Sequence, residues 1–174
     1  EANIPEDRQV TYYLYGGDWE NRLKQELLLG IGGLRALRNL GYAPEVFHCN
    51  EGHAAFTGLE RLREYVQNDH LGFGEAIEVV RASSLFTTHT PVPAGHDSFD
   101  EGLLRKYVGH LPSLLQVDWE TIMGLGRKNP SDGSEKFSMS YLAANLSQNV
   151  NGVSKLHGEV SRNIFSGLYP GYLP

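Results

Sequence analysis

Cysteine is almost missing from the 174-residue chain, which contains Cys49 alone. A single cysteine excludes a framework of intramolecular disulfides and is typical of a reducing compartment, so we expect a cytoplasmic protein. The chain also lacks an unbroken apolar run of the ~18 residues that a membrane helix needs, which predicts no membrane partner. No charged and then apolar leader opens the sequence, so we expect no signal peptide.

Basic residues are also scarce, since Lys and Arg number 15 against 21 Asp and Glu, a net charge of −6. Nucleic acids and anionic lipids bind concentrated basic faces, so this balance predicts no nucleic-acid partner. The apolar share of 40% is ordinary for a globular domain, whereas 20 glycines is a surplus. The sequence starts without Met and ends on a proline, and we expect residues 1–174 to form a single incomplete domain.

Short apolar segments alternate with longer segments of helical periodicity, which predicts an α/β fold. We expect a Rossmann-like parallel sheet with flanking helices. The predicted strands are residues 10–15, 46–49, 84–88 and 149–153. The predicted helices are a long one after Asp18, then residues 54–66, 74–81, 98–111, 118–125, 138–146 and 154–165.

The long helix has clear end signals. Asp18 is a good N-cap, and Gly41 stands where a glycine ends a helix. Its apolar stripe starts at Leu23, and we expect Glu26 on another face. The glycines at residues 30, 32 and 33 indicate close helix packing rather than a phosphate loop, because no strand precedes them.

Parallel sheets carry their functional loops at the carboxyl ends of the strands. Glu51, His53 and His89 follow two predicted strands there, and a third loop contains Asn151. These neutral and acidic hydrogen-bonding groups suit the hydroxyl groups of a carbohydrate. Two structural alternatives stay open: Asn50 and Glu51 merely cap the next helix, or His89 only bonds a nearby carbonyl.

Metal and nucleophile chemistry have little support in the sequence. The possible metal ligands are His48, Cys49, His53, His89 and His96. They follow no zinc-binding spacing, and no nucleophile elbow is present. We therefore predict no metal site, and we expect Cys49 to be an inert thiol within a strand.

Four motifs, in this order along nearly the whole chain, resemble the α-glucan phosphorylases, the family of glycogen, starch and maltodextrin phosphorylase, and most closely its bacterial branch. They lie within residues 14–26, 48–56, 86–97 and 150–157, and include Arg22-Leu23-Lys24-Gln25-Glu26, His48-Cys49-Asn50-Glu51-Gly52-His53, Thr88-His89-Thr90-Pro91 and Val150-Asn151-Gly152-Val153.

The resemblance implies a GT-B fold, in which two Rossmann-like domains face each other across a cleft. This chain would be an internal fragment of the N-terminal domain. The implied reaction releases glucose 1-phosphate from α-1,4-glucan by using phosphate, with pyridoxal phosphate as cofactor. The lysine that carries this cofactor and the phosphate-binding residues belong to the C-terminal domain, so the fragment is expected to be inactive alone.

The resemblance also implies site residues. His89 matches the histidine that hydrogen-bonds the glucosyl 6-hydroxyl, and Thr90 is its neighbour in the substrate site. Glu51 and His53 match residues beside the next sugar, where animal and maltodextrin enzymes carry aspartate in place of Glu51. Asp18 and Arg22 match the gate aspartate and the arginine that follows it, although the gate loop is much shorter here.

The implied partners are α-1,4-glucan, phosphate, the remainder of the polypeptide and a second copy in a homodimer. Three alternatives remain at this point. A glycogen or starch synthase would share the GT-B fold, a non-catalytic glucan-binding module would share the cleft, and a metallohydrolase would use the histidines.

Overall fold

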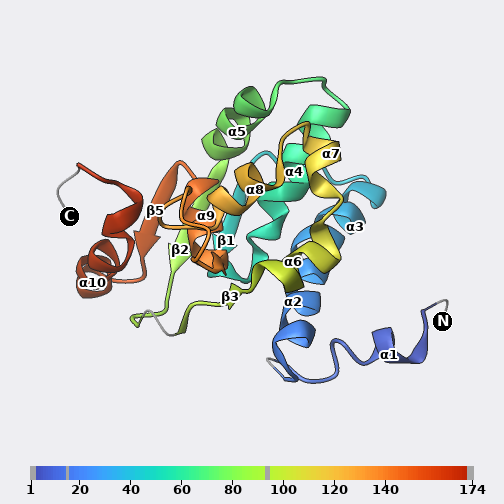
Figure 1. Ribbon diagram of the computed structural model, residues 1–174, viewed down its shortest axis with the longest axis horizontal. Coiled ribbons are helices and arrows are strands. Elements are labelled where there is room, and N and C mark those ends of the chain that lie inside the picture. The colour runs from blue at the N-terminus through green and yellow to red at the C-terminus, as the bar shows by residue number, and fades with distance from the viewer. Residues whose placement is uncertain (1–2, 15, 93–94, 172–174) are drawn as a thin grey trace.

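The fold is a parallel sheet with helices packed against it, as the computed structural model shows for residues 3–14, 16–92 and 95–171 (Figure 1). The sheet contains β1 (Phe47–Asn50), β2 (Ser84–Thr88) and β5 (Asn149–Gly152) in the order β1-β2-β5. Both pairings are parallel. The predicted α/β class and three of the four predicted strands are confirmed.

The other elements are mostly helices, and none of those described has the length and apolar character needed to cross a bilayer. They are α1 (Pro5–Arg8), α2 (Trp19–Leu27), the π-helical η1 (Leu28–Gly32), α3 (Gly33–Asn39), η2 (Gly52–Ala54), α4 (Phe56–Gln67), α5 (Phe73–Ala82), α6 (Glu101–Val108), α7 (Leu111–Leu115), α8 (Trp119–Leu125), α9 (Met139–Asn145), α10 (Lys155–Phe165) and η4 (Ser166–Leu168). A second, antiparallel pair joins β3 (Ser98–Phe99) to β4 (Phe137–Ser138).

The two faces of the parallel sheet differ sharply. Phe86 lies in the core and meets the Phe165 ring of α10 edge to face, at 6.0 Å between centroids. On the opposite face His48 and Asn151 are exposed. Strands that advance in one direction through right-handed crossovers place all their connecting helices on one face. The described helices therefore cover one side of the sheet and leave the other side open.

Two predicted elements are wrong. Residues 10–14 form turns rather than a strand, and Tyr12 and Tyr13 are exposed, because the described residues offer this segment no partner strand. Ser98 does not cap a helix. It pairs with Ser138 so that Phe99 enters the core, and the helix starts only at Glu101.

Some residues used in the predictions lie outside the described part of the chain: Tyr15, Pro93, Ala94 and residues 172–174.

The ends of the long helix are as predicted. The Asp18 carboxylate accepts the Asn21 N–H at 2.8 Å and caps α2. At the other end Gly41 has φ +83°, and its N–H donates to the Arg38 carbonyl while Tyr42 N–H donates to that of Leu37, both at 3.0 Å. These two hydrogen bonds form a Schellman motif, in which glycine adopts the left-handed conformation at low cost.

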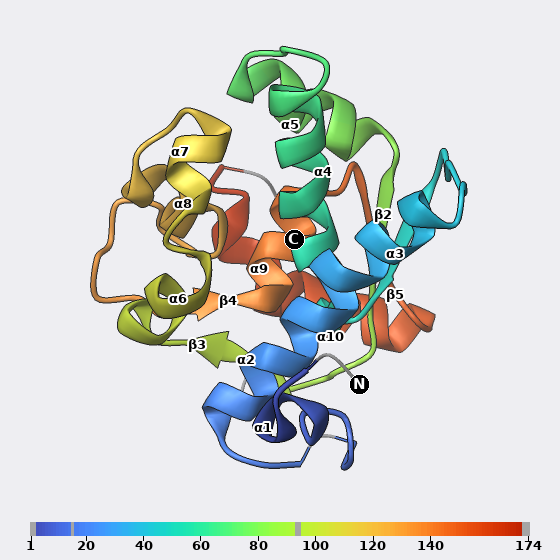
Figure 2. The same cartoon turned by 90° about the vertical axis from the view of Figure 1, so that its right-hand side faces the viewer.

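The glycines in the middle of this helix have different roles. Figure 2 shows the helix passing beside α4. Gly30 is buried where the helix contacts α4. A Cβ atom at Gly30 would lie 2.7 Å from the Phe56 Cβ and 2.8 Å from the Thr57 nitrogen. At Gly33 the nearest such atom is 4.0 Å away. The predicted close packing is confirmed for Gly30 and does not extend to Gly33.

Candidate functional site

The loops after β1 and β2 meet at the carboxyl edge of the sheet, as predicted. The Glu51 carboxylate accepts hydrogen bonds from the backbone N–H groups of His89 and Thr90, the latter at 2.6 Å. The Glu51 N–H donates in turn to the Thr87 carbonyl at 3.0 Å. Because a charged acceptor strengthens such bonds, Glu51 fixes the course of the loop that carries His89.

Glu51 itself adopts an unusual backbone. Its φ is +65°, in the left-handed region that side-chain-bearing residues rarely occupy, and only 8% of the residue is exposed. The interpretation of Glu51 as a helix cap is wrong, because its side chain makes no hydrogen bond to the helix that follows. Non-glycine residues in this region persist only where the surroundings hold them, often at functional sites.

A row of polar side chains crosses the open face of the sheet. The Thr87 hydroxyl donates to the Asn151 amide oxygen at 2.9 Å, and His48 Nε2 lies 2.8 Å from the same hydroxyl. Since Thr87 has one proton and gives it to Asn151, His48 must donate from Nε2. The row ties the third loop, near Asn151, to the other two.

His89 lies at the end of β2, with its side chain exposed. Its ring makes no hydrogen bond to any described residue, so the alternative of a structural histidine bonded to a carbonyl receives no support there. Both nitrogens are therefore available to a ligand, whereas the main chain of His89 and Thr90 is held by Glu51.

A second group of predicted residues gathers around α2. Arg22 Nη2 lies 2.7 Å from Asp97 Oδ2 and 2.6 Å from His53 Nδ1. Arg22 Nε lies 3.1 Å from Glu26 Oε1. Glu26 is 1% exposed, so its prediction as a surface residue is wrong. It lies within the buried side of α2, where it helps to surround the guanidinium.

The electrostatics of this group are unusual. Burial raises the pKa of Glu26 to about 7. Hydrogen bonding to Asp97 and Glu26 raises the pKa of His53 to about 9. Burial would raise the pKa of Asp97, but hydrogen bonds from His53 and Arg22 outweigh burial and lower it. Arg22 also approaches His53 Nδ1 and opposes protonation there, but two carboxylates face this ring against one guanidinium, so its pKa rises.

Two cavities border the group. One of about 530 Å³ is lined by Asp18, Trp19, Arg22, His53 and Asp97, among others. Another of about 270 Å³ is also lined by Arg22 and His53, together with Glu26 and Tyr13 among others. Asp18 thus both caps α2 and faces a cavity beside the strand-end loops. The exposed Trp19 ring lines the 530 Å³ cavity and supplies an apolar surface on which a sugar can stack.

Glu26, His53 and Asp97 place possible metal-ligand atoms within 4.8 Å of one another. Arg22 contacts all three side chains, so a cation already lies among these ligand atoms. This arrangement fits a buried ion-pair network better than a metal site. Burial also raises the pKa of the Cys49 thiol to about 11, so it is not a thiolate nucleophile at neutral pH.

We expect Glu26→Gln to flatten the dependence of stability on pH. A carboxyl whose folded pKa is raised stabilises the fold fully below its unfolded pKa, near 4.5, and loses this as pH rises through about 7. From pH 5 to pH 8 the free energy of unfolding, measured by thermal unfolding, should fall in the wild type by roughly 2 kcal/mol more than in the variant. Glu20→Gln, on the exposed side of α2, is the control. If the free energy of unfolding changed equally with pH in both variants, Glu26 would not be the source of the pH dependence.

Sequence reasoning missed Glu26 and Asp97 as members of the site. The sequence could have indicated that Glu26 is buried. Glu26 lies three residues after Leu23 and four before Gly30, a helical spacing that places it on the buried side of the helix. Asp97 had no such signal. It reaches Arg22 only because the segment before β3 folds back over α2, a contact between residues 75 positions apart.

Comparisons with known proteins bear on this arrangement. The family model described as carbohydrate phosphorylase matches residues 36–171. The glycogen phosphorylase of Mycobacterium tuberculosis is 46% identical over all of this chain, which covers 22% of that protein. The maltodextrin phosphorylase of Thermococcus litoralis is 43% identical over 97% of the chain and 19% of its own length. The glycogen phosphorylase of Aquifex aeolicus is 34% identical over 97% of the chain and 24% of its own length.

Proposed function

Since the chain belongs to the carbohydrate phosphorylase family, we propose that it is part of an α-1,4-glucan phosphorylase. The complete enzyme would release glucose 1-phosphate from glycogen, starch or maltodextrin by using phosphate. The observation that carries the proposal is the meeting of Glu51, His89 and Thr90 at one edge of a parallel sheet. This edge is where α/β proteins bind their ligands.

His89 is proposed as the catalytic-site residue that holds the glucosyl unit. Its exposed ring can donate from one nitrogen and accept at the other, which suits a sugar hydroxyl. Glu51 and Thr90 belong to the same substrate site. Glu51 uses one carboxylate oxygen to fix the loop, so its contribution to sugar binding is mainly the placement of His89 and Thr90.

The group around α2 is proposed to contact the next part of the glucan. His53 and Arg22 line the 530 Å³ cavity together with Asp18. Ion pairs with Glu26 and Asp97 hold Arg22, and contacts with Arg22 and Asp97 hold His53, so a ligand would meet both side chains already ordered. Groups that are ordered before binding lose little entropy when the transition state forms, which favours catalysis.

The proposal includes pyridoxal phosphate as the cofactor of the complete enzyme, where it would supply acid and base chemistry through its phosphate group. This chain does not provide its lysine, because a Schiff-base lysine needs a sheltered pocket that lowers its pKa. The lysines of the chain are all half-buried or exposed: Lys24, Lys106, Lys128, Lys136 and Lys155. We therefore propose that the remainder of the polypeptide holds the cofactor.

The chain spans about a fifth of the length of the curated relatives it matches. We propose that residues 1–174 are an incomplete N-terminal domain of a GT-B fold, completed by the rest of the same polypeptide. A homodimer and a cytoplasmic location are part of the proposal. The single, unpaired cysteine is consistent with that compartment.

The direct test is release of glucose 1-phosphate. The complete polypeptide, loaded with pyridoxal phosphate, should convert maltoheptaose and phosphate to glucose 1-phosphate, and the 174-residue chain should not. Transfer from a nucleotide sugar without phosphorolysis would instead identify a synthase. Maltooligosaccharide binding by the complete polypeptide without turnover would identify a binding module.

His89→Ala in the complete enzyme should lower kcat/KM about tenfold for both short and long glucans, because one neutral hydrogen bond to the glucosyl unit is lost. His110→Ala, which removes another exposed histidine, is the matched control. The measurement is steady-state phosphorolysis with maltotetraose and with glycogen. An unchanged rate would remove His89 from the site.

A further inference from the structure

The chain that leaves β2 returns beside Thr90 before it reaches β3. A Cβ atom added at Gly95 would lie 2.6 Å from the Thr90 Cγ2 atom, so the returning segment touches the loop that carries His89. His96 and Asp97 follow Gly95 directly. Asp97 belongs to the ion-paired group around α2, so the returning segment links that group to the loop of His89.

Helices α9 and α10 hold the returning segment in place. The His96 Nδ1 atom lies 2.6 Å from Ser140 Oγ of α9. The His96 ring meets the Phe165 ring of α10 nearly edge to face, at 5.7 Å between centroids. The Met139 N–H donates to the Asp97 carbonyl at 3.0 Å. His96 therefore connects the segment to the core, in which Phe165 lies.

The contact with Ser140 determines which ring nitrogen of His96 carries the proton. Ser140 is 2% exposed, and its hydroxyl has no other hydrogen-bond partner among the described residues. A buried hydroxyl that leaves its proton unpaired destabilises the fold, so Ser140 donates to Nδ1. Burial also lowers the pKa of His96, which keeps the ring neutral at pH 7. A neutral ring that accepts at Nδ1 carries its proton at Nε2.

The main chain of Thr90 lies near this Nε2–H group. Nε2 is buried and makes no hydrogen bond of regular geometry within the described part of the chain. Burial has the largest effect on the pKa of the ring, and the carboxylates of Glu51 and Asp97 and the Thr90 main chain oppose it. A main-chain group that stabilises a protonated ring does so through its oxygen. Because Ser140 occupies Nδ1, the Thr90 oxygen is an acceptor for Nε2–H.

We propose that His96 is a positioning residue for the sugar site, in which its Nε2–H group donates to the Thr90 main-chain oxygen. A buried donor is rarely left unpaired in a protein interior, and this bond would satisfy it. The Glu51 carboxylate already accepts the Thr90 N–H at 2.6 Å. Thr90 would then be held at both of its main-chain polar groups, which fixes the orientation of His89 beside it. The effect on a bound sugar rests on the proposed function, whereas the bond between His96 and Thr90 does not.

Two amide variants of the complete polypeptide separate positioning from a purely structural role. His96→Asn places its amide near the position of Nδ1, so it keeps a partner for Ser140 and loses Nε2. His96→Gln places its amide near the position of Nε2 and gives up Ser140. The melting temperature should be higher for His96→Asn, because the buried hydroxyl stays paired. Amide exchange at His89 and Thr90 should follow the opposite order and be about tenfold slower in His96→Gln.

Phosphorolysis should follow the amide exchange and not the melting temperature. We expect kcat/KM to be about tenfold lower for His96→Asn than for His96→Gln, with maltotetraose and with glycogen alike. If exchange and kcat/KM both follow the melting temperature, His96 is only structural and the proposal is overturned. The predicted order of exchange in a polypeptide without phosphorolysis would support the positioning role and contradict the proposed function.

The wild-type protein provides a test that needs no variant to fold. The nitrogen chemical shifts of the His96 ring in the complete polypeptide should show a neutral imidazole with its proton at Nε2. A proton at Nδ1 would leave Nε2 unable to donate to Thr90, and the proposal would be overturned.

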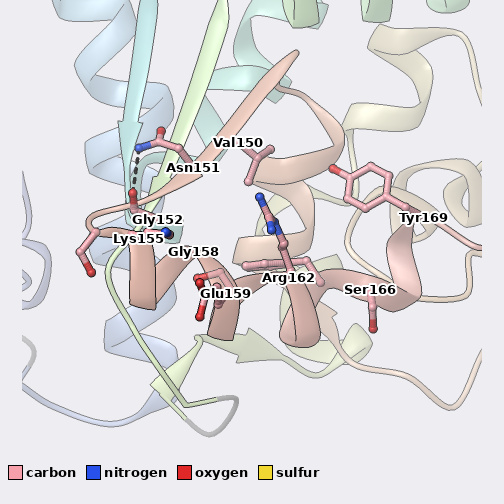
Figure 3. Close-up of a pocket in the computed structure, with 12 residues that line it drawn as sticks. Val150, Asn151, Gly152, Lys155, Gly158, Glu159, Arg162, Ser166 and Tyr169 are labelled. Atoms are coloured by element: carbon pink, nitrogen blue, oxygen red, sulfur yellow. Dashed lines mark hydrogen bonds between the residues drawn. The ribbon is translucent and has the colours of Figure 1, made fainter. Parts of the chain in front are cut away.

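His157 offers a matched control on α10. It is also buried, its Nδ1 lies 3.3 Å from Ser161 Oγ, and its Nε2 has no hydrogen-bond partner in the described ranges. Its neighbour Gly152 lies beside the first turn of α10, where a groove of about 510 Å³ separates the helix from the free edge of β5 (Figure 3). His157→Gln should lower the melting temperature and leave amide exchange at His89 and Thr90 unchanged. Faster exchange there would mean that loss of any buried histidine loosens the loop, which would overturn the specific role of His96.

Discussion

In the complete polypeptide, Glu51→Ala is expected to lower phosphorolysis by about a hundredfold, which corresponds to roughly 3 kcal/mol. The Glu51 carboxylate accepts from two consecutive backbone N–H groups, those of His89 and Thr90. Removing it leaves both donors without their charged partner, and the loop that carries His89 loses its anchor. The measurement is kcat/KM with glucans of several lengths.

Two further variants separate loop placement from direct contact with sugar. Glu51→Gly suits the φ of +65° better than alanine, so an equal loss there excludes backbone strain as the cause. Glu51→Gln keeps one oxygen acceptor without the charge and should be intermediate. The loss should be the same for every glucan length and should accompany faster amide exchange at His89 and Thr90. A loss limited to long glucans, with unchanged exchange, would favour direct contact.

Gly30→Ala is expected to destabilise the fold by about 2–3 kcal/mol. The new Cβ would lie 2.7 Å from the Phe56 Cβ and 2.8 Å from the Thr57 nitrogen, both parts of the α4 backbone region that have little freedom to move. The helix must then separate from α4, which also weakens the 3.3 Å bond from the Thr57 hydroxyl to the Gly30 carbonyl. Thermal or denaturant unfolding measures the change.

Gly33→Ala is the matched control, three residues further along the same helix. Its Cβ would have no neighbour closer than 4.0 Å, so alanine should stabilise the helix by about 0.5–1 kcal/mol through its higher helix propensity. The two substitutions add the same atom and should have opposite signs. A loss of similar size at both positions would mean that helix contact is not the cause at Gly30.

The sequence predicts most of the fold wherever the signal is local. The buried strand from Ser84 to Thr88 is predicted with its observed bounds, because an apolar run ends there at a proline-rich loop. The cap at Asp18 is also predicted from a local signal, because Asp is a favoured N-cap residue directly before the apolar stripe of the helix. Ser98 fails because a capping pattern competes with a tertiary contact: pairing with Ser138 buries Phe99, and burial of an aromatic ring outweighs a cap.

The candidate site is predicted less completely. Parallel-sheet topology correctly brings Glu51 and His89 together, although the roles of the site residues remain predictions. The backbone-binding role of Glu51 is invisible in the sequence, because it depends on where the loop after β2 turns. Asp97 is unpredictable for a similar reason, since its contact with Arg22 joins distant segments through a fold-back that no periodicity encodes.

The order of the strands also has a kinetic consequence. The chain between β1 and β2 contains η2, α4 and α5, whereas the longer chain between β2 and β5 contains α6 to α9. Longer loops cost more entropy to close, so β1 and β2 should associate first during folding and β5 last. The final event of folding would then create the edge and groove of β5, and a newly synthesised chain would expose that edge only after the rest of the core has closed.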